Sequence, residues 1–263
     1  AEYVVVNQNL CTRIPDNTDI KEASFTVLGS IALHGLRLSE TSLGSKIVVI
    51  GLGIIGQLVS RLAEAQGSEV IGIDPDTKRT DLSANFYTSV EEANMTNVDS
   101  VIITAATSSN EPIEVATKIA RNKAKIVVVG DIPLNISRND FYYKELELVV
   151  SKSYGPGRYD KQYEILGKDY PIEYVRWTEN RNFEAFIKLL SQNQIHLLDL
   201  VTEEVSFENA PAVYKKFSGE DKPLSVVLRY DNKSEPKIDF QRIVELEPKT
   251  CLLYTSPSPR DGL

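Results

Sequence analysis

The sequence of 263 residues has few of the features that mark disulfide-rich, zinc-stabilised or membrane-spanning proteins. Its two cysteines exclude a disulfide framework, and two cysteines with two histidines supply too few ligands for a structural zinc cage. The longest apolar stretch, residues 47–59, is interrupted by three glycines and by Gln57. A membrane-spanning helix needs roughly 20 apolar residues, so we expect no membrane segment.

Basic residues are outnumbered by acidic ones, and the formal net charge is −8. An acidic chain without a basic tract is not expected to bind nucleic acid or an anionic membrane surface. The sequence also lacks the basic and apolar regions of a signal peptide, so the expected location is cytoplasmic and the expected partner is a small-molecule substrate.

Both ends of the sequence differ from ordinary domain boundaries. The chain begins with a strand-like run and no initiator methionine, so we expect it to be the interior of a larger protein. Residues 231–250 are polar and are expected to form a linker. Residues 251–263 resemble the translation of a transposon-end sequencing adapter, with a disordered Pro/Ser tail as the alternative.

The rest of the chain alternates between short β-branched runs and helical periodicity. This alternation predicts an α/β fold: a Rossmann doubly wound parallel sheet with strand order 3-2-1-4-5-6 over residues 21–180. The last elements of the expected fold are a segment at 201–207, a helix at 208–217 and a segment at 224–230. The expected strands are residues 46–50, 69–73, 85–88, 100–104, 125–129 and 146–150, and the main expected helices are residues 20–39, 54–66, 112–122 and 182–194.

The strongest chemical signal is the run GLGIIG, which directly follows the first expected strand and opens a helix. Gly51 permits the tight turn, Gly53 lets the backbone approach a pyrophosphate, and Gly56 allows close packing of helix and strand. The N–H groups of Ile54 and Ile55 and the helix dipole then face the phosphates. This context predicts a dinucleotide-binding turn rather than a glycine-rich turn that binds nothing.

An acidic residue, Asp74, ends the next expected strand, 21 residues after Gly53. This is close to the spacing of about 20 residues for the carboxylate that binds the ribose hydroxyls. Because a carboxylate there repels a 2′-phosphate, NAD is favoured over NADP. Lys78 and Arg79 leave NADP open as the alternative; otherwise they form a solvated helix start.

Further contacts are expected at the carboxyl ends of later strands, where ligands of this fold bind. Thr104 and Ala105 follow the fourth strand, and Gly130 follows the fifth. Residues 151–180 are rich in tyrosine and have no clean periodicity. Arg158 and Arg176 are candidates for holding a hydroxylated or anionic substrate group, because Arg forks bind carboxylate or phosphate. The alternative is an aromatic interdomain or dimer contact.

Several runs carry a resemblance to a known family. SKIVVIG before the fingerprint and the runs LVTE and ENAP near residues 200–211 resemble the C-terminal two thirds of a medium-chain dehydrogenase of the zinc-type alcohol dehydrogenase superfamily. SYGPGRYD at 153–160 and RWT at 176–178 more closely resemble the dehydrogenase module of bi-domain oxidoreductases. The resemblance covers residues 1–230 and implies that residues 1–20 and 181–230 are the remnant of a GroES-like domain.

The resemblance implies an NAD(P)-dependent oxidoreductase of alcohols, polyols or sugars, inactive as this fragment alone, with a homodimer formed through the sixth strand. The family's zinc ligand falls on Thr26, 25 residues before Gly51. Threonine is a poor zinc ligand, so we expect no zinc, and Tyr154 or Tyr159 becomes a candidate proton donor. The alternative is a non-catalytic dinucleotide-binding module that regulates or scaffolds a fused oxidoreductase domain.

Overall fold

The structure is a computed structural model that describes residues 4–83, 85–217 and 222–230. The chain divides into a unit of residues 1–229 and a unit of residues 230–263, of which only Tyr230 is described. The expected linker at 231–250 and the adapter-like tail at 251–263 therefore lie outside the described residues.

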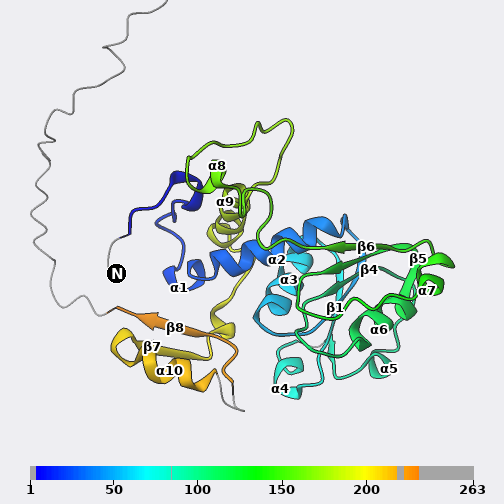
Figure 1. Ribbon diagram of the computed structural model, residues 1–263. Coiled ribbons are helices and arrows are strands. Elements are labelled where there is room, and N and C mark those ends of the chain that lie inside the picture. Colours follow the sequence, from blue (N-terminus) through cyan, green and yellow to red (C-terminus); the bar gives the residue numbers. More distant parts are fainter. Residues whose placement is uncertain (1–3, 84, 218–221, 231–263) are drawn as a thin grey trace, which may run out of the picture. The chain divides into compact units, whose positions relative to one another are not determined.

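A six-stranded sheet is the centre of the first unit (Figure 1). Its strands are β1 (Lys46–Ile50), β2 (Glu69–Ile73), β3 (Phe86–Tyr87), β4 (Val98–Ile103), β5 (Ala120–Val128) and β6 (Glu147–Val150). The order is β3-β2-β1-β4-β5-β6, and every neighbouring pair is parallel. The predicted Rossmann fold and its strand order are confirmed.

Helices connect the strands, and several of their boundaries differ from the predicted ones. α6 ends at Ile119 rather than at residue 122, and Lys144 Nζ donates to its last carbonyl oxygens. α9 begins at Glu179 rather than at residue 182, because Thr178 caps it by accepting the N–H of Arg181. The main helices are α2 (Thr26–Leu38), α3 (Ile54–Ala65), α6 (Glu111–Ile119), α9 (Glu179–Ser191) and α10 (Ala210–Lys216). The short ones are α1 (Ile20–Ala23), α4 (Thr77–Thr80), α5 (Val90–Ala93), α7 (Arg138–Tyr142) and α8 (Lys161–Glu164), with 3₁₀ turns at Gln8–Leu10, Leu198–Leu200 and Phe207–Asn209.

The single helix expected over residues 20–39 is divided in two. α1 ends at Ala23, and α2 begins at Thr26, whose hydroxyl donates to the Ala23 carbonyl oxygen at 2.6 Å. The side chain of Asp19 caps α1 by accepting the backbone N–H of Lys21 at 2.7 Å. The cap at Asp19 and the hydrogen bond of Thr26 to Ala23 therefore separate α1 from α2.

Alternate residues of β1 belong to two separate apolar layers. Ile47 and Val49 pack in the layer that holds α2, α3 and α9. Val48 and Ile50 pack in the layer that holds α6. Because both faces of the sheet are covered, the strand is a continuous apolar run rather than an alternating one, as is typical of parallel sheets.

A second, two-stranded sheet is formed by β7 (Glu203–Ser206) and β8 (Val226–Arg229), which pair in parallel. α10 lies between them in the sequence. The assignment of residues 1–20 and 181–230 to the remnant of a GroES-like domain stays a prediction. Most of α9 lies within the second range and packs on α2 in the core of the first unit.

The segment of residues 151–178 follows β6 and leads into α9, with α8 as its only helix in this described stretch (Figure 1). It is held to α9 by Arg181, whose Nη1 donates to the Val175 carbonyl oxygen at 2.7 Å. Asn182 Nδ2 also donates to the Tyr154 carbonyl oxygen, at 3.0 Å. The 151–178 segment is therefore packed structure rather than a free loop.

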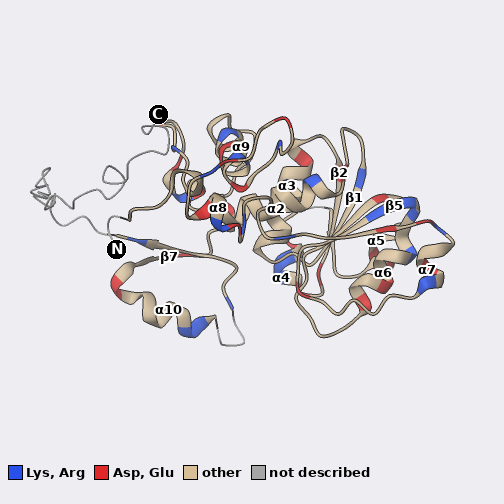
Figure 2. Cartoon of the chain, turned by 45° about the horizontal axis from the view of Figure 1, so that its top comes forward, with Lys and Arg blue, Asp and Glu red and all other residues tan. Residues whose placement is uncertain are grey.

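Charged residues of both signs are interspersed over the helices and loops (Figure 2). Among them are exposed ion pairs, such as Lys123 Nζ with Glu145 Oε2 at 3.3 Å, which contribute little to stability. Within the described ranges, no helix combines the length and the apolar character needed to cross a bilayer.

Candidate dinucleotide-binding site

The three fingerprint glycines occupy the turn between β1 and α3, and each has different surroundings. Gly51 has φ +96°, and a Cβ there would lie 2.5 Å from the backbone nitrogen of Ala105. A Cβ at Gly56 would lie 1.9 Å from the Gly51 carbonyl oxygen. A Cβ at Gly53 would have no atom within 4 Å. Gly51 and Gly56 are therefore required by close packing, whereas the surface of Gly53 is open.

The open surface of Gly53 lies at the start of α3. Gly53 is the N-cap residue of this helix, and no side chain caps it. The first N–H groups of a helix have no carbonyl partner within the helix. The N–H groups of Ile54 and Ile55 belong to this first turn, so they and the positive end of the helix dipole are placed for an anion.

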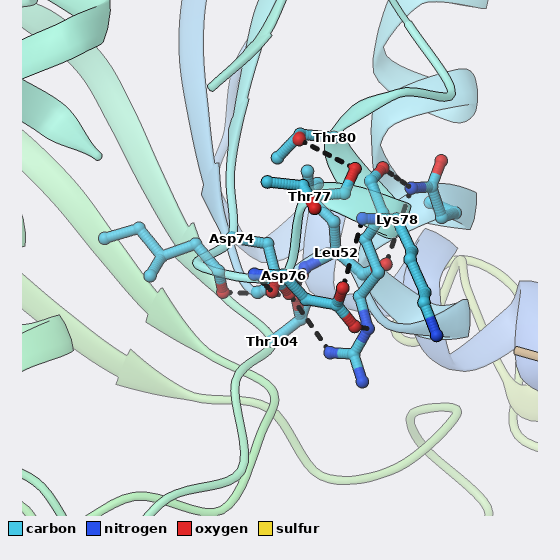
Figure 3. Close-up of polar contacts among 11 residues, drawn as sticks. Leu52, Asp74, Asp76, Thr77, Lys78, Thr80 and Thr104 are labelled. Atoms are coloured by element: carbon cyan, nitrogen blue, oxygen red, sulfur yellow. Dashed lines mark hydrogen bonds and ion pairs between the residues drawn. The ribbon is translucent and has the colours of Figure 1, made fainter. Parts of the chain in front are cut away.

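The carboxylate of Asp74 is buried at the end of β2 and joins the fingerprint turn to the next loop (Figure 3). Its Oδ2 accepts the backbone N–H of Leu52 at 2.7 Å, and its Oδ1 accepts that of Asp76 at 2.9 Å. Hydrogen bonds from two N–H groups fix the orientation of this carboxylate beside the glycine turn.

Arg79 forms ion pairs with two carboxylates next to the turn. Its Nη1 lies 3.1 Å from Asp74 Oδ2, and its Nε lies 3.3 Å from Asp76 Oδ2. Arg79 is therefore paired with both carboxylates at the start of a short helix, although its side chain is 40% exposed, and its contact with a 2′-phosphate stays a prediction. The backbone N–H of Lys78 donates to Asp76 Oδ1 at 3.1 Å.

Thr104, Ala105 and Gly130 lie on the same edge of the sheet as the glycine turn. The hydroxyl of Thr104 donates to the Gly51 carbonyl oxygen. A Cβ at Gly130 would lie 2.0 Å from the Ala105 carbonyl oxygen. The residues after β1, β4 and β5 are therefore in direct contact, and the structure brings these cofactor candidates together.

The substrate and proton-donor candidates fall into two other groups. Arg158 pairs with Glu164 at 2.8 Å, and its guanidinium carbon lies 5.2 Å from the ring centroid of Tyr154 and 4.3 Å from that of Tyr159. Burial raises the pKa of the Tyr154 hydroxyl. Arg176 belongs to the second group, with Trp177, and its guanidinium carbon lies 3.9 Å from the centroid of that ring.

Sequence reasoning missed the burial of Glu179. Its side chain is fully buried, and neither carboxylate oxygen has a hydrogen-bond partner in the described chain. Burial, followed by the charge of Glu164, raises the pKa of Glu179 to about 7. An acidic residue in the first turn of a helix is an ordinary pattern, so the sequence carried no signal for its burial.

A parallel sheet of this order, with a glycine turn after β1 and a buried carboxylate at the end of β2, defines a Rossmann-type dinucleotide-binding fold. Comparison with known families agrees with this class. Residues 29–140 match the family model described as "D-isomer specific 2-hydroxyacid dehydrogenase, NAD binding domain". The match begins within α2 and ends within α7.

Curated relatives and solved structures extend the similarity beyond this domain. The chain is 28% identical to 2-dehydro-3-deoxy-L-galactonate 5-dehydrogenase of Pseudoalteromonas atlantica, over 59% of this chain and 49% of that protein. It is 24% identical to D-guloside 3-dehydrogenase of Escherichia coli, over 81% and 62%. Galactitol-1-phosphate dehydrogenase of Escherichia coli has the same fold, with a TM-score of 0.69, 22% identity, and coverage of 87% and 66%.

These relatives and structural neighbours are alcohol, polyol and sugar dehydrogenases. The predicted resemblance of the chain to such enzymes is therefore confirmed. The chain spans about half to three fifths of the length of the curated relatives it matches. The comparisons support a nicotinamide dinucleotide as the cofactor.

Proposed function

We propose that this chain is the cofactor-binding part of an NAD(P)-dependent oxidoreductase that acts on a small alcohol, polyol or sugar. Hydride would move between the nicotinamide and a carbinol or carbonyl carbon. The observation that carries the proposal is the open surface of Gly53, at the uncapped start of α3 and beside the turn that Asp74 holds. The dehydrogenase relatives support the same reaction class.

The residues of the site fit a dinucleotide in an extended position. Ile54 and Ile55 would bind the pyrophosphate through their N–H groups, and Asp74 would accept the ribose hydroxyls. The edge formed by Thr104 and Gly130 would border the nicotinamide, which supplies or accepts the hydride when it is bound.

A proton must accompany the hydride, and Tyr154 is our candidate donor, with Tyr159 as the second. A tyrosine hydroxyl carries its proton at neutral pH, as a general acid requires, although burial moves the pKa of Tyr154 further above that range. Arg158 lies beside both rings and would stabilise an oxyanion that forms there. Arg158 and Arg176 remain candidates for holding substrate.

We further propose that NAD is preferred to NADP. The carboxylate of Asp74 is fixed and buried beside the turn, so a 2′-phosphate would meet its charge. Arg79 offsets part of this repulsion because its guanidinium group lies against the same carboxylate. Arg79 therefore sets how much NADP is tolerated rather than selecting it.

Zinc is not part of the proposed reaction. The position of the family's zinc ligand holds Thr26, and its hydroxyl donates to the Ala23 carbonyl oxygen at the start of α2. This residue does not fit a metal site, because zinc in proteins is held by Cys, His and carboxylates. The same observation favours a second candidate function, a non-catalytic dinucleotide-binding module that regulates or scaffolds a fused oxidoreductase domain.

Calorimetric titration of the full chain with NAD and NADP tests the cofactor proposal. Asp74→Asn removes the charge but keeps an oxygen for the Leu52 N–H. It should weaken NAD binding by about 1–3 kcal/mol, the contribution of hydrogen bonds to a charged group, and should weaken NADP less or strengthen it. Asp81→Asn, at an exposed carboxylate after α4, is the matched control and should change neither.

Three results would contradict the proposal: no binding of either cofactor, a wild-type preference for NADP, or equal weakening of both by Asp74→Asn. A panel of polyols and sugars with bound NAD separates the two functions. Formation of reduced cofactor, followed by absorbance, supports the oxidoreductase. Tight cofactor binding without turnover of any substrate, in a protein that includes the partner domain, supports the binding module.

A further inference from the structure

Trp177, the only tryptophan of the sequence, has two arginine side chains over its ring. The guanidinium carbon of Arg37 lies 3.4 Å from the ring centroid, and that of Arg176 lies 3.9 Å from it. Arg37 belongs to the last turn of α2, whereas Arg176 is near the end of the 151–178 segment. The fold therefore brings two positive charges from distant parts of the sequence to one aromatic ring.

Neither guanidinium group has an acidic partner within the described part of the chain. Arg37 Nε donates to the neutral Asn182 Oδ1 at 3.0 Å, and Arg176 has its cation–π contact with Trp177. The arrangement differs from that of other arginines in this protein. Those with a carboxylate partner include Arg61, Arg79, Arg121, Arg158 and Arg181.

The two charges repel each other in the chain by itself. Burial, followed by the charge of Arg176, lowers the pKa of Arg37 to about 10. Arg37 is also held in place, since Asn182 is buried and its amide donates to the Tyr154 carbonyl oxygen. The repulsion between two neighbouring cations without a counter-ion is relieved when one anion accepts hydrogen bonds from both.

We propose that Arg37 and Arg176 form a binding site for a small dianion, a phosphate monoester or a dicarboxylate, beside Trp177. The planar fork of each guanidinium group matches the oxygens of phosphate and carboxylate. The net charge of −8 opposes general attraction of anions, so binding depends on this local pair. The site is built on α2 and the 151–178 segment, apart from the turns that form the dinucleotide site.

The single tryptophan makes the site directly observable. Fluorescence of Trp177 in the full chain is titrated with inorganic phosphate at constant ionic strength, and a saturable change is expected. Phosphate bound at the start of α3 gives no such signal from Trp177. Parallel titrations with a hexose monophosphate and with citrate distinguish a phosphate monoester from a dicarboxylate as the preferred ligand.

Variants separate the proposal from a structural role. Arg176→Gln changes an exposed side chain and should weaken phosphate binding about 10-fold or more, as for a lost charge-assisted hydrogen bond. Arg176→Lys keeps the charge without the fork and should be intermediate. Arg138→Gln is the matched control, because Arg138 lies over a single ring, that of Tyr142, at 4.6 Å; it should leave the affinity unchanged.

Saturating NAD should leave the midpoint of the phosphate titration unchanged. The proposal is overturned by an absent or non-saturating change in the wild type, by equal affinity in Arg176→Gln and wild type, or by competition with NAD. None of these results depends on whether the chain is catalytic, and NAD binding is measured separately by calorimetry.

Discussion

Glu179 should make the stability of this fold depend on pH in the neutral range. The residue begins α9 and is fully buried, and both of its carboxylate oxygens lack a hydrogen-bond partner in the described chain. Two charged residues act on it in opposite directions, because Glu164 raises its pKa and Arg158 lowers it. Burial outweighs both, so the folded protein holds Glu179 protonated at a pH where a free glutamate is ionised.

The sign and size of the effect follow from the two states. The pKa of Glu179 rises from 4.5 to about 7 on folding. Below the pH range between these two pKa values, Glu179 is protonated in both the folded and the unfolded state. Within it the unfolded chain releases the proton and the folded chain keeps it, so the free energy of unfolding falls as pH rises, and the loss is complete above about pH 7. At 1.36 kcal/mol for each pH unit, the whole window corresponds to about 3 kcal/mol.

Urea unfolding of the wild type and Glu179→Gln between about pH 5 and pH 8 measures this effect. Glutamine keeps the shape and cannot ionise. The free energy of unfolding of the variant, relative to that of the wild type, should therefore rise by about 2–3 kcal/mol from about pH 5 to pH 8. Other titrating groups, such as Glu64 and His34, are common to both proteins and cancel in the comparison. Glu184→Gln, at an exposed position of the same helix, should behave as the wild type. A constant difference between wild type and Glu179→Gln at every pH would refute the reasoning.

Two further predictions concern packing and assembly. Gly56→Ala places a Cβ 1.9 Å from the Gly51 carbonyl oxygen and should cost more than about 2 kcal/mol in the free energy of unfolding, measured in urea; an unchanged midpoint would contradict the close packing. The edge of β6 is expected to pair with that of a second copy, so Val150→Lys, at a side chain that is 59% exposed, should shift a dimer to a monomer in sedimentation velocity. A wild type that stays monomeric at high concentration argues against this pairing.

The central strands could be predicted because their signal is local. β1 and β2 begin and end at the predicted residues, since each is a short apolar run covered on both faces. β5 was predicted only over 125–129, but it begins at Ala120, which pairs with Val98 before an irregularity in the ladder. The polar residues at this start have no strand signal, and the pairing with β4 determines their conformation.

The candidate site also contains features that the local sequence predicts and features that depend on tertiary contacts. The glycine turn and Asp74 are recognisable from spacing alone because one strand-turn-helix unit positions them. The ion pairs of Arg79, the burial of Glu179 and the two arginines at Trp177 were not predicted. Each depends on side-chain contacts that spacing does not specify, and the last two also require the 151–178 segment to be packed against α2 and α9.

The different surroundings of the three glycines separate the loss of binding from the loss of folding. Gly51 has a positive φ and Gly56 has no space for a side chain, so the fold itself selects for both. Gly53 has φ −62° and ψ −178°, which any residue adopts, and it has open space around its surface. A descendant of this chain that no longer needed a cofactor would thus be free to change residue 53 while keeping the other two. The identity of that single residue would then distinguish lineages that still bind a dinucleotide from those that retain only the scaffold.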